Sequence, residues 1–65
     1  MARNKDAKSA YEGLKPSEIE YQDAAVERKW AAGNAANGYH DVAEKNLRNA
    51  DQCEQRGAWY QVRGQ

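Results

Sequence analysis

The scarcity of bulky aliphatic side chains is the feature that most constrains how this 65-residue chain can fold. Phe is absent, and Leu, Ile and Val together occur only six times, at Leu14, Ile19, Val26, Val42, Leu47 and Val62. Six of 65 residues is about 9%, well below the roughly 20% under which disorder becomes a serious expectation. The sequence therefore predicts one small domain whose thin core is completed from outside the chain.

Disulfides, a metal ion or another subunit usually stabilise a domain of this kind. Cys53 is the single cysteine, so it has no partner for an internal disulfide. His40, the single histidine, lies one turn from Glu44, but about 20 Å of helical rise separates it from Cys53. This distance excludes a closed metal site and a Cys–His nucleophile pair within one chain. No cofactor or metal is expected, which leaves a homodimer or a partner protein.

Charge and hydropathy restrict the partners further. Ten basic and ten acidic residues cancel, which argues against a general nucleic-acid coat protein. No stretch approaches the ~18 to 20 apolar residues of a membrane span, and residues 1–6 lack the apolar core of a secretory signal. A lone thiol without such a signal predicts a cytoplasmic location.

Residues 1–15 are polar and mildly basic, and we expect them to form a flexible arm. In an alternative hypothesis this arm helps an accessory protein bind nucleic acid, together with four cations further along the chain, Arg28, Lys29, Lys45 and Arg48.

The clearest local signal is a capping box that begins at Ser17. The Ser17 hydroxyl can accept from the backbone N–H of Glu20, whose carboxylate can reach back to the N–H of Ser17. We therefore expect a helix over about residues 18–32, and its acidic residues Glu18, Glu20, Asp23 and Glu27 are explained as helix N-terminal charge and a solvated face.

Gly and Asn residues at positions 33–38 predict a turn, because both accept the left-handed backbone of a helix end. A second helix is expected over about 39–56, ended by Arg56 and Gly57, with an aromatic tail at 58–65. The predicted fold is all-α: a two-helix antiparallel hairpin within residues 16–57, completed by dimerisation or partner binding. The alternative is one long continuous helix, since alanines keep a helical stripe through the proposed turn.

Two apolar stripes follow from helical spacing. Ile19, Val26, Trp30 and Gly33 share one face of the first helix, and the second helix carries Tyr39, Val42, Ala43, Leu47, Ala50 and Cys53. On this stripe Cys53 is interpreted as a small buried hydrophobe or a group near a dimer seam.

Trp and Tyr side chains dominate the energetics of protein interfaces. Those of this chain either form its core or anchor a partner, and the candidate partner-binding residues are Tyr21, Trp30, Tyr39, Trp59 and Tyr60. No catalytic constellation is visible, so no enzymatic activity is expected. The leading hypothesis is a small adaptor or inhibitor that docks on a larger protein, similar in scale to accessory proteins of phages and plasmids. A structural subunit of a larger assembly is a further alternative.

Overall fold

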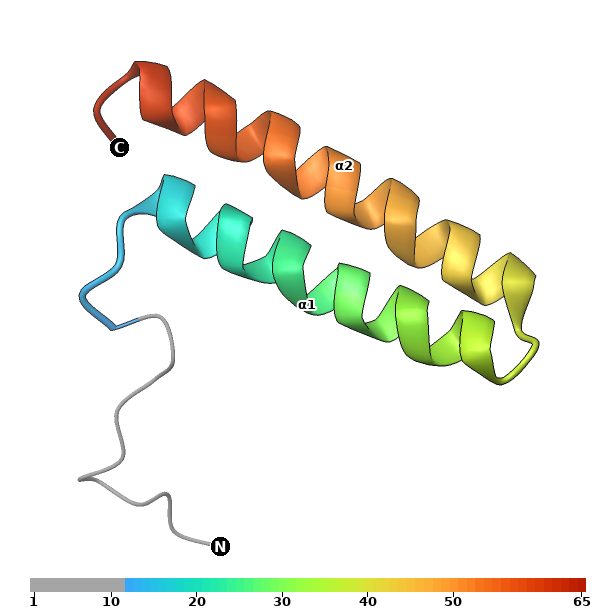
Figure 1. The fold of residues 1–65 in the computed structure, drawn as a ribbon. Helices are drawn as coiled ribbons and strands as arrows, with labels where there is room; N and C mark the ends of the chain where they lie inside the picture. Colours follow the sequence, from blue (N-terminus) through green and yellow to red (C-terminus); the bar gives the residue numbers. More distant parts are fainter. Residues whose placement is uncertain (1–11) are drawn as a thin grey trace, which may run out of the picture.

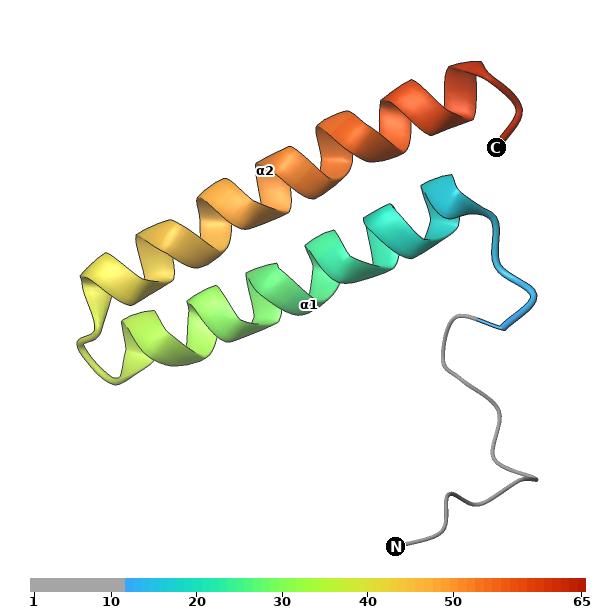
Figure 2. The same ribbon diagram turned by 180° about the vertical axis from the view of Figure 1, so that it is seen from behind.

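Two antiparallel helices form a hairpin in the computed structural model, which describes residues 12–65 (Figures 1 and 2). Helix α1 spans Pro16–Ala36 and helix α2 spans His40–Val62. The helices lie side by side along their whole length, and the C-terminus of the chain lies next to the start of α1. The predicted all-α hairpin is confirmed, and the alternative of a single continuous helix is wrong. Most of the arm expected at 1–15 lies outside the described residues.

The start of α1 differs in detail from the predicted capping box. Lys15 occupies the N-cap position, and its backbone N–H donates to the Glu18 carboxylate over 2.8 Å. The helix begins earlier than expected because Pro16 fits the first helical position, where its missing N–H costs nothing. Ser17 is therefore buried within the first turn instead of capping it, and its N–H donates to the main-chain oxygen of Gln65 over 3.0 Å.

Both helices end at a glycine in the left-handed region. After α1, Gly38 has φ 84°, its N–H donates to the carbonyl of Ala35, and the next N–H, of Tyr39, donates to that of Asn34. The same pattern follows α2, where Gly64 has φ 76°. These are Schellman motifs, which satisfy carbonyls that a helix end would otherwise leave unpaired.

The predicted stop at Gly57 is wrong. Helix α2 continues through this glycine to Val62, so most of the expected tail at 58–65 is helical. Gly57 is buried in the contact with α1, where a Cβ atom would come 3.0 Å from Cε1 of Tyr21. Close packing therefore explains this glycine better than a helix end does.

Small side chains build the seam between the helices. All of them except Cys53 follow a seven-residue spacing, which keeps one face of each helix against the other, as in a coiled coil. The buried members are Ser17, Ala24 and Ala31 on α1 and Ala43, Ala50, Cys53 and Gly57 on α2. Not one bulky side chain is fully buried among the described residues. The seam brings the two backbones together but buries little apolar area, because alanine and glycine have little to bury.

A short polar chain crosses the seam near the turn. Asn34 Nδ2 donates to Asn46 Oδ1 over 2.9 Å, and Asn46 Nδ2 donates to Glu27 Oε1 over 2.9 Å. These three side chains are half-buried, so a shift of one helix along the other would leave their polar atoms without partners. A polar group at such a position fixes how two helices align.

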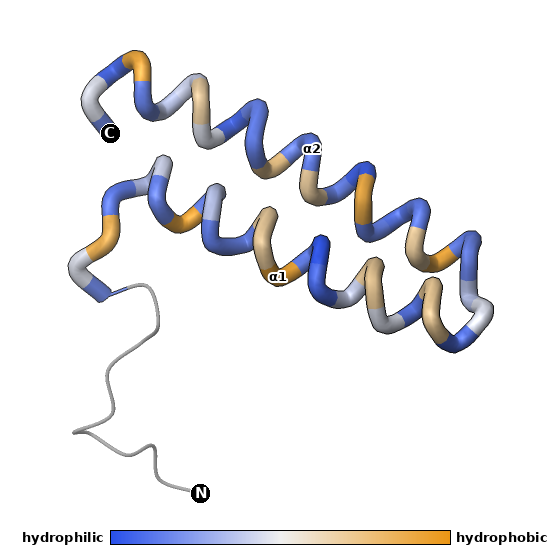
Figure 3. Tube along the Cα trace, in the orientation of Figure 1, coloured by the Kyte–Doolittle hydropathy of each residue, from blue (hydrophilic) through white to orange (hydrophobic). Residues whose placement is uncertain are grey.

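The large apolar residues lie elsewhere. Figure 3 shows the strongly hydrophobic positions as isolated turns separated by hydrophilic ones, with no continuous hydrophobic band between α1 and α2. The bulky side chains that are exposed are Tyr21, Val26, Trp30, Tyr39, Val42, Leu47, Trp59 and Val62. Most of the bulky apolar surface of the hairpin therefore faces outward.

Candidate protein-interaction surface

One side of the hairpin is closed by contacts between the helices. The Tyr21 ring of α1 lies over Gly57, and its hydroxyl donates to Gln61 Oε1 over 2.9 Å. Further along, Arg28 is hydrogen-bonded to Glu54 and lies 3.8 Å from Asp51. The hydrogen bond to the Glu54 carboxylate raises the pKa of Arg28. Tyr21, a predicted partner-binding residue, thus already has a role within the hairpin.

The opposite side is tied by Arg56 of α2. Its Nε donates to Glu20 Oε2 over 3.0 Å, and the bond to this carboxylate raises the pKa of Arg56. Its Nη2 also lies 3.3 Å from the Cys53 sulfur. Burial raises the pKa of the Cys53 thiol; the nearby Arg56 opposes this shift, and Glu20 and Asp23 add to it. Cys53 is therefore a buried neutral thiol, as the sequence indicated, and lacks the lowered pKa of a reactive cysteine.

The predicted stripe on α1 exists, but it faces away from α2. Trp30 is 63% exposed and Val26 is 46% exposed, while Ile19 is half-buried. A hollow beside these residues is lined by Val26, Lys29, Trp30 and Gly33. We refer to Ile19, Val26, Trp30 and Gly33 as the α1 outer stripe.

A second aromatic group stands near the end of α2. The Trp59 and Tyr60 rings meet edge to face with centroids 5.2 Å apart, and the Arg63 guanidinium carbon lies 3.6 Å from the centroid of the Trp59 ring. Arg63 is held there by a hydrogen bond from Nη1 to the Trp59 carbonyl over 2.8 Å. Trp59 is 53% exposed although both neighbours cover part of it.

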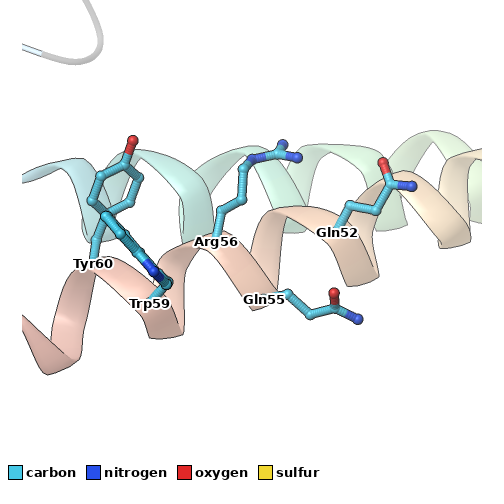
Figure 4. Close-up of a pocket in the computed structure, with 5 residues that line it drawn as sticks. All are labelled: Gln52, Gln55, Arg56, Trp59 and Tyr60. Carbon is cyan, nitrogen blue, oxygen red and sulfur yellow. The ribbon is translucent and has the colours of Figure 1, made fainter.

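A shallow hollow next to Trp59 and Tyr60 continues along α2. Figure 4 shows its lining side chains, which all project from the one helix: Gln52, Gln55, Arg56, Trp59 and Tyr60. Tyr60, Arg56 and Gln52 point to the same side of the ribbon. Steps of three and four residues are the spacing with which a helix presents contacts to another protein. We call these five residues, together with Arg63, the α2 aromatic ridge.

The turn end of the molecule carries the last predicted aromatic. Tyr39 is 61% exposed and lines another hollow together with His40 and Val42. It lies at the opposite end of α2 from Trp59, so the fold does not gather the five candidate aromatics into one site. Tyr21, Trp59 and Tyr60 lie toward the end with the C-terminus, Tyr39 lies at the turn, and Trp30 lies between them.

No group of three or more His, Cys, Asp and Glu side chains able to hold a metal ion occurs within residues 12–65. His40 begins α2 and is exposed, while Cys53 is buried near its middle. The hollows on the two helices are each lined by a few residues and are open to solvent. Sites for small molecules, in contrast, surround most of the ligand surface.

One of the four cations proposed for nucleic-acid binding already has acidic partners in the hairpin. Arg28 is bound to Glu54 and close to Asp51, so acidic groups neutralise it. Lys29 follows it on α1, whereas Lys45 and Arg48 lie on α2. The basic residues of the arm before Glu12 lie outside the described part of the chain.

Three seam residues of α2, Ala43, Ala50 and Cys53, were expected on an apolar stripe, whereas Gly57 and the small residues of the α1 seam were not. The signal for the seam was the repeat of small side chains seven residues apart, Ala43, Ala50 and Gly57 on α2 and Ser17, Ala24 and Ala31 on α1. The bulky residues of α1 lie on another face of the helix. A helix can carry two apolar stripes and pack through the one with smaller side chains, which lets the two backbones come closer together.

Comparison of the chain with protein-family models, curated proteins and solved structures finds no match. Neither helix in the described region is long and apolar enough to cross a membrane.

Proposed function

We propose that this chain is a small, non-enzymatic protein-interaction module that docks on a larger protein through the α2 aromatic ridge. The observation that carries the proposal is the Trp59–Tyr60–Arg63 group. Its two rings and the guanidinium are held by contacts within the chain, and yet Trp59 remains 53% exposed.

Trp, Tyr and Arg are the residue types most often found at the energetic centres of interfaces. Here Arg63 and Tyr60 restrain the Trp59 ring before any partner arrives. A restrained anchor loses less side-chain entropy on binding, so more of its contact energy is available for affinity. Gln52 and Gln55 continue the ridge with amide groups that can donate and accept hydrogen bonds at its rim.

A non-enzymatic role agrees with the open surfaces of the hairpin, because a catalytic site needs a rigid shell around its reacting groups. A lone buried cysteine is compatible with a reducing compartment such as the cytoplasm. The small size of the chain favours a role as an adaptor or inhibitor, similar to accessory proteins of phages or plasmids.

The test is quantitative capture from a lysate of the native host with three immobilised baits. These are the natural chain, a Trp59→Ala/Tyr60→Ala variant, and a Val62→Ala control, in which a residue 85% exposed on the same helix is shortened. We expect a stoichiometric protein on the natural and control baits, reduced at least about tenfold on the double variant. Equal recovery on all three baits would contradict the proposal.

A further inference from the structure

Arg63 is the one cation of the α2 aromatic ridge that no acidic side chain neutralises within residues 12–65. The other cation of the ridge, Arg56, is bound to Glu20. We propose that the ridge binds an acidic segment of the partner protein, in which an Asp or Glu carboxylate accepts hydrogen bonds from Arg63 and a nearby apolar side chain packs on Trp59. This inference rests on the function proposed for the ridge and names the chemistry of its partner.

Two contacts hold the Arg63 side chain in place before a partner binds. Its guanidinium carbon lies 3.6 Å from the centroid of the Trp59 ring, and its Nη1 donates to the Trp59 carbonyl over 2.8 Å. A side chain that is already ordered loses less rotamer entropy on binding. Lys29, beside the α1 outer stripe, is the contrasting case, because no hydrogen bond, ion pair or ring contact restrains its ammonium group in the described part of the chain.

A role in capping α2 explains only part of the bonding of Arg63. Cations in the last turn of a helix bind its terminal carbonyls, and the bond from Nη1 does this. Arginine has five N–H donors, so this one bond leaves the donors of Nε and Nη2 without a protein acceptor among residues 12–65. A carboxylate can accept two parallel bonds from such a guanidinium edge. Because Arg63 is exposed, the cap positions it for an acidic ligand from outside the chain.

The other residues of the ridge favour an acidic and partly apolar ligand. None of them is acidic, and the charge of Arg56 is already balanced by Glu20 over 3.0 Å. The half-exposed ring of Trp59 lies one helical turn from Arg63, which is about 6 Å of rise. A partner segment with an apolar and an acidic side chain at about this spacing can therefore fill both positions.

The number of unpaired charges favours a protein carboxylate over the phosphates of a nucleic acid. Nucleic-acid binding draws its affinity from many phosphate contacts, each made by a Lys or Arg side chain. The ridge offers one unpaired cation, beside the aromatic residues that are typical of protein interfaces. An acidic protein segment matches both the single charge and its apolar surroundings.

Selection from a phage-displayed library of random short peptides tests the proposal on the full chain. The baits are the natural chain, Arg63→Gln, and Arg48→Gln, which removes an exposed arginine of the same helix outside the ridge. A Trp59→Ala/Tyr60→Ala bait identifies the peptides that bind the ridge, and circular dichroism verifies that each bait is helical. On the natural and Arg48→Gln baits we expect ridge-binding peptides to be enriched at least about threefold in Asp and Glu near an apolar residue. This enrichment should disappear on Arg63→Gln.

Titration of the most enriched acidic peptide and its amide counterpart, in which Asp and Glu are replaced by Asn and Gln, measures the contact itself. The amide peptide should bind the natural chain about tenfold more weakly, because a charge-assisted hydrogen bond is lost. Arg63→Gln should bind the two peptides equally, which a merely structural effect of Arg63 on the Trp59 ring would not produce. Higher salt should weaken only the pair of natural chain and acidic peptide.

The outcomes separate this inference from the function on which it rests. Ridge-binding peptides without acidic enrichment, or the same acidic preference on Arg63→Gln, would overturn the acidic partner and leave the proposed function in place. An oligonucleotide that binds the natural chain more tightly than the peptide, and loses affinity with Arg63→Gln, would assign Arg63 to a phosphate instead. If no selected peptide depended on Trp59 and Tyr60, the inference would be contradicted, and capture from the host lysate would decide the proposed function separately.

Discussion

The Cβ atom that alanine would add at Gly57 comes 3.0 Å from Cε1 of Tyr21, a ring whose hydroxyl is hydrogen-bonded to Gln61 across the hairpin. Glycine within a helix costs about 1 kcal/mol relative to alanine. The hairpin accepts this cost at Gly57 because the Tyr21 ring occupies the space of the missing side chain.

Gly57→Ala should therefore stabilise the natural chain by clearly less than the gain of about 1 kcal/mol in helix propensity, because the Tyr21 ring has to move away from Gln61. In a Tyr21→Ala background the same change should raise the free energy of unfolding by about 1 kcal/mol, the gain in helix propensity alone. Urea unfolding of the four chains of this double-mutant cycle measures both effects. An equal effect of Gly57→Ala in the two backgrounds would show that the ring does not occupy this site.

Asn46 holds the polar chain at the seam by bonding both Asn34 and Glu27. Asn46→Ala removes two hydrogen bonds, each worth about 0.5–1.5 kcal/mol, so we expect a loss of about 1–3 kcal/mol in the free energy of unfolding. Asn49→Ala, at an exposed position of the same helix, is the control and should change it by less than about 0.5 kcal/mol. Similar changes in the two variants would mean that the hydrogen bonds of Asn46 do not stabilise the hairpin.

Gly38 has φ 84° in the turn between the helices, where a Cβ atom is strained but meets no neighbour. Gly38→Ala should lower the free energy of unfolding by about 1–2 kcal/mol. Gly38→Asn should cost less, because asparagine tolerates the left-handed region better. Thermal unfolding compares the two variants. If alanine were as well tolerated as asparagine, backbone strain would not control this turn.

Burial raises the pKa of the Cys53 thiol in the folded chain above its value in the unfolded chain. The folded state therefore binds this proton more tightly, and its contribution to stability is complete below the unfolded pKa and is lost as the pH rises through the folded one. We expect the stability of the natural chain to decline above about pH 8.5, the ordinary thiol pKa, more steeply than that of a Cys53→Ala variant. If the stability of the two chains declined equally with pH, the Cys53 thiol would not be the cause of the decline.

Alkylation offers an independent measurement on the same group. Cys53 in the folded chain should react with iodoacetamide far more slowly than in the urea-unfolded chain, because it is 6% exposed and its thiolate is disfavoured. Comparable rates in the two states would show that the thiol is accessible.

The hairpin could be predicted from the sequence because its turn has strong local signals. Asn37 and Gly38 stop α1, and Gly38 takes the left-handed conformation that few other residues accept. The end of α2 could not be placed in the same way, since Gly57 and Gly64 are the same residue type with different roles. Only the position of the Tyr21 ring over Gly57 shows that this glycine serves packing, and this contact joins residues far apart in the sequence.

Two residues of the α2 aromatic ridge, Trp59 and Tyr60, were candidates in the sequence, but the arrangement of the exposed surface was not predicted. Periodicity placed Val26 and Trp30 on one face of α1, yet it could not decide whether this face or that of Ala24 and Ala31 would meet α2. The smaller residues form the seam because they let the two backbones approach closely. Trp30, which could equally have been core, is therefore left outside.

The central claim is that the hairpin is completed by association, because its seam buries small side chains and its bulky ones face outward. The most direct test is equilibrium unfolding in urea, followed by circular dichroism, over a hundredfold range of chain concentration. We predict that the midpoint rises with concentration, as mass action requires when association stabilises the folded state. A midpoint that stays constant over this range, with a cooperative transition, would show that the hairpin is stable on its own and would contradict the account.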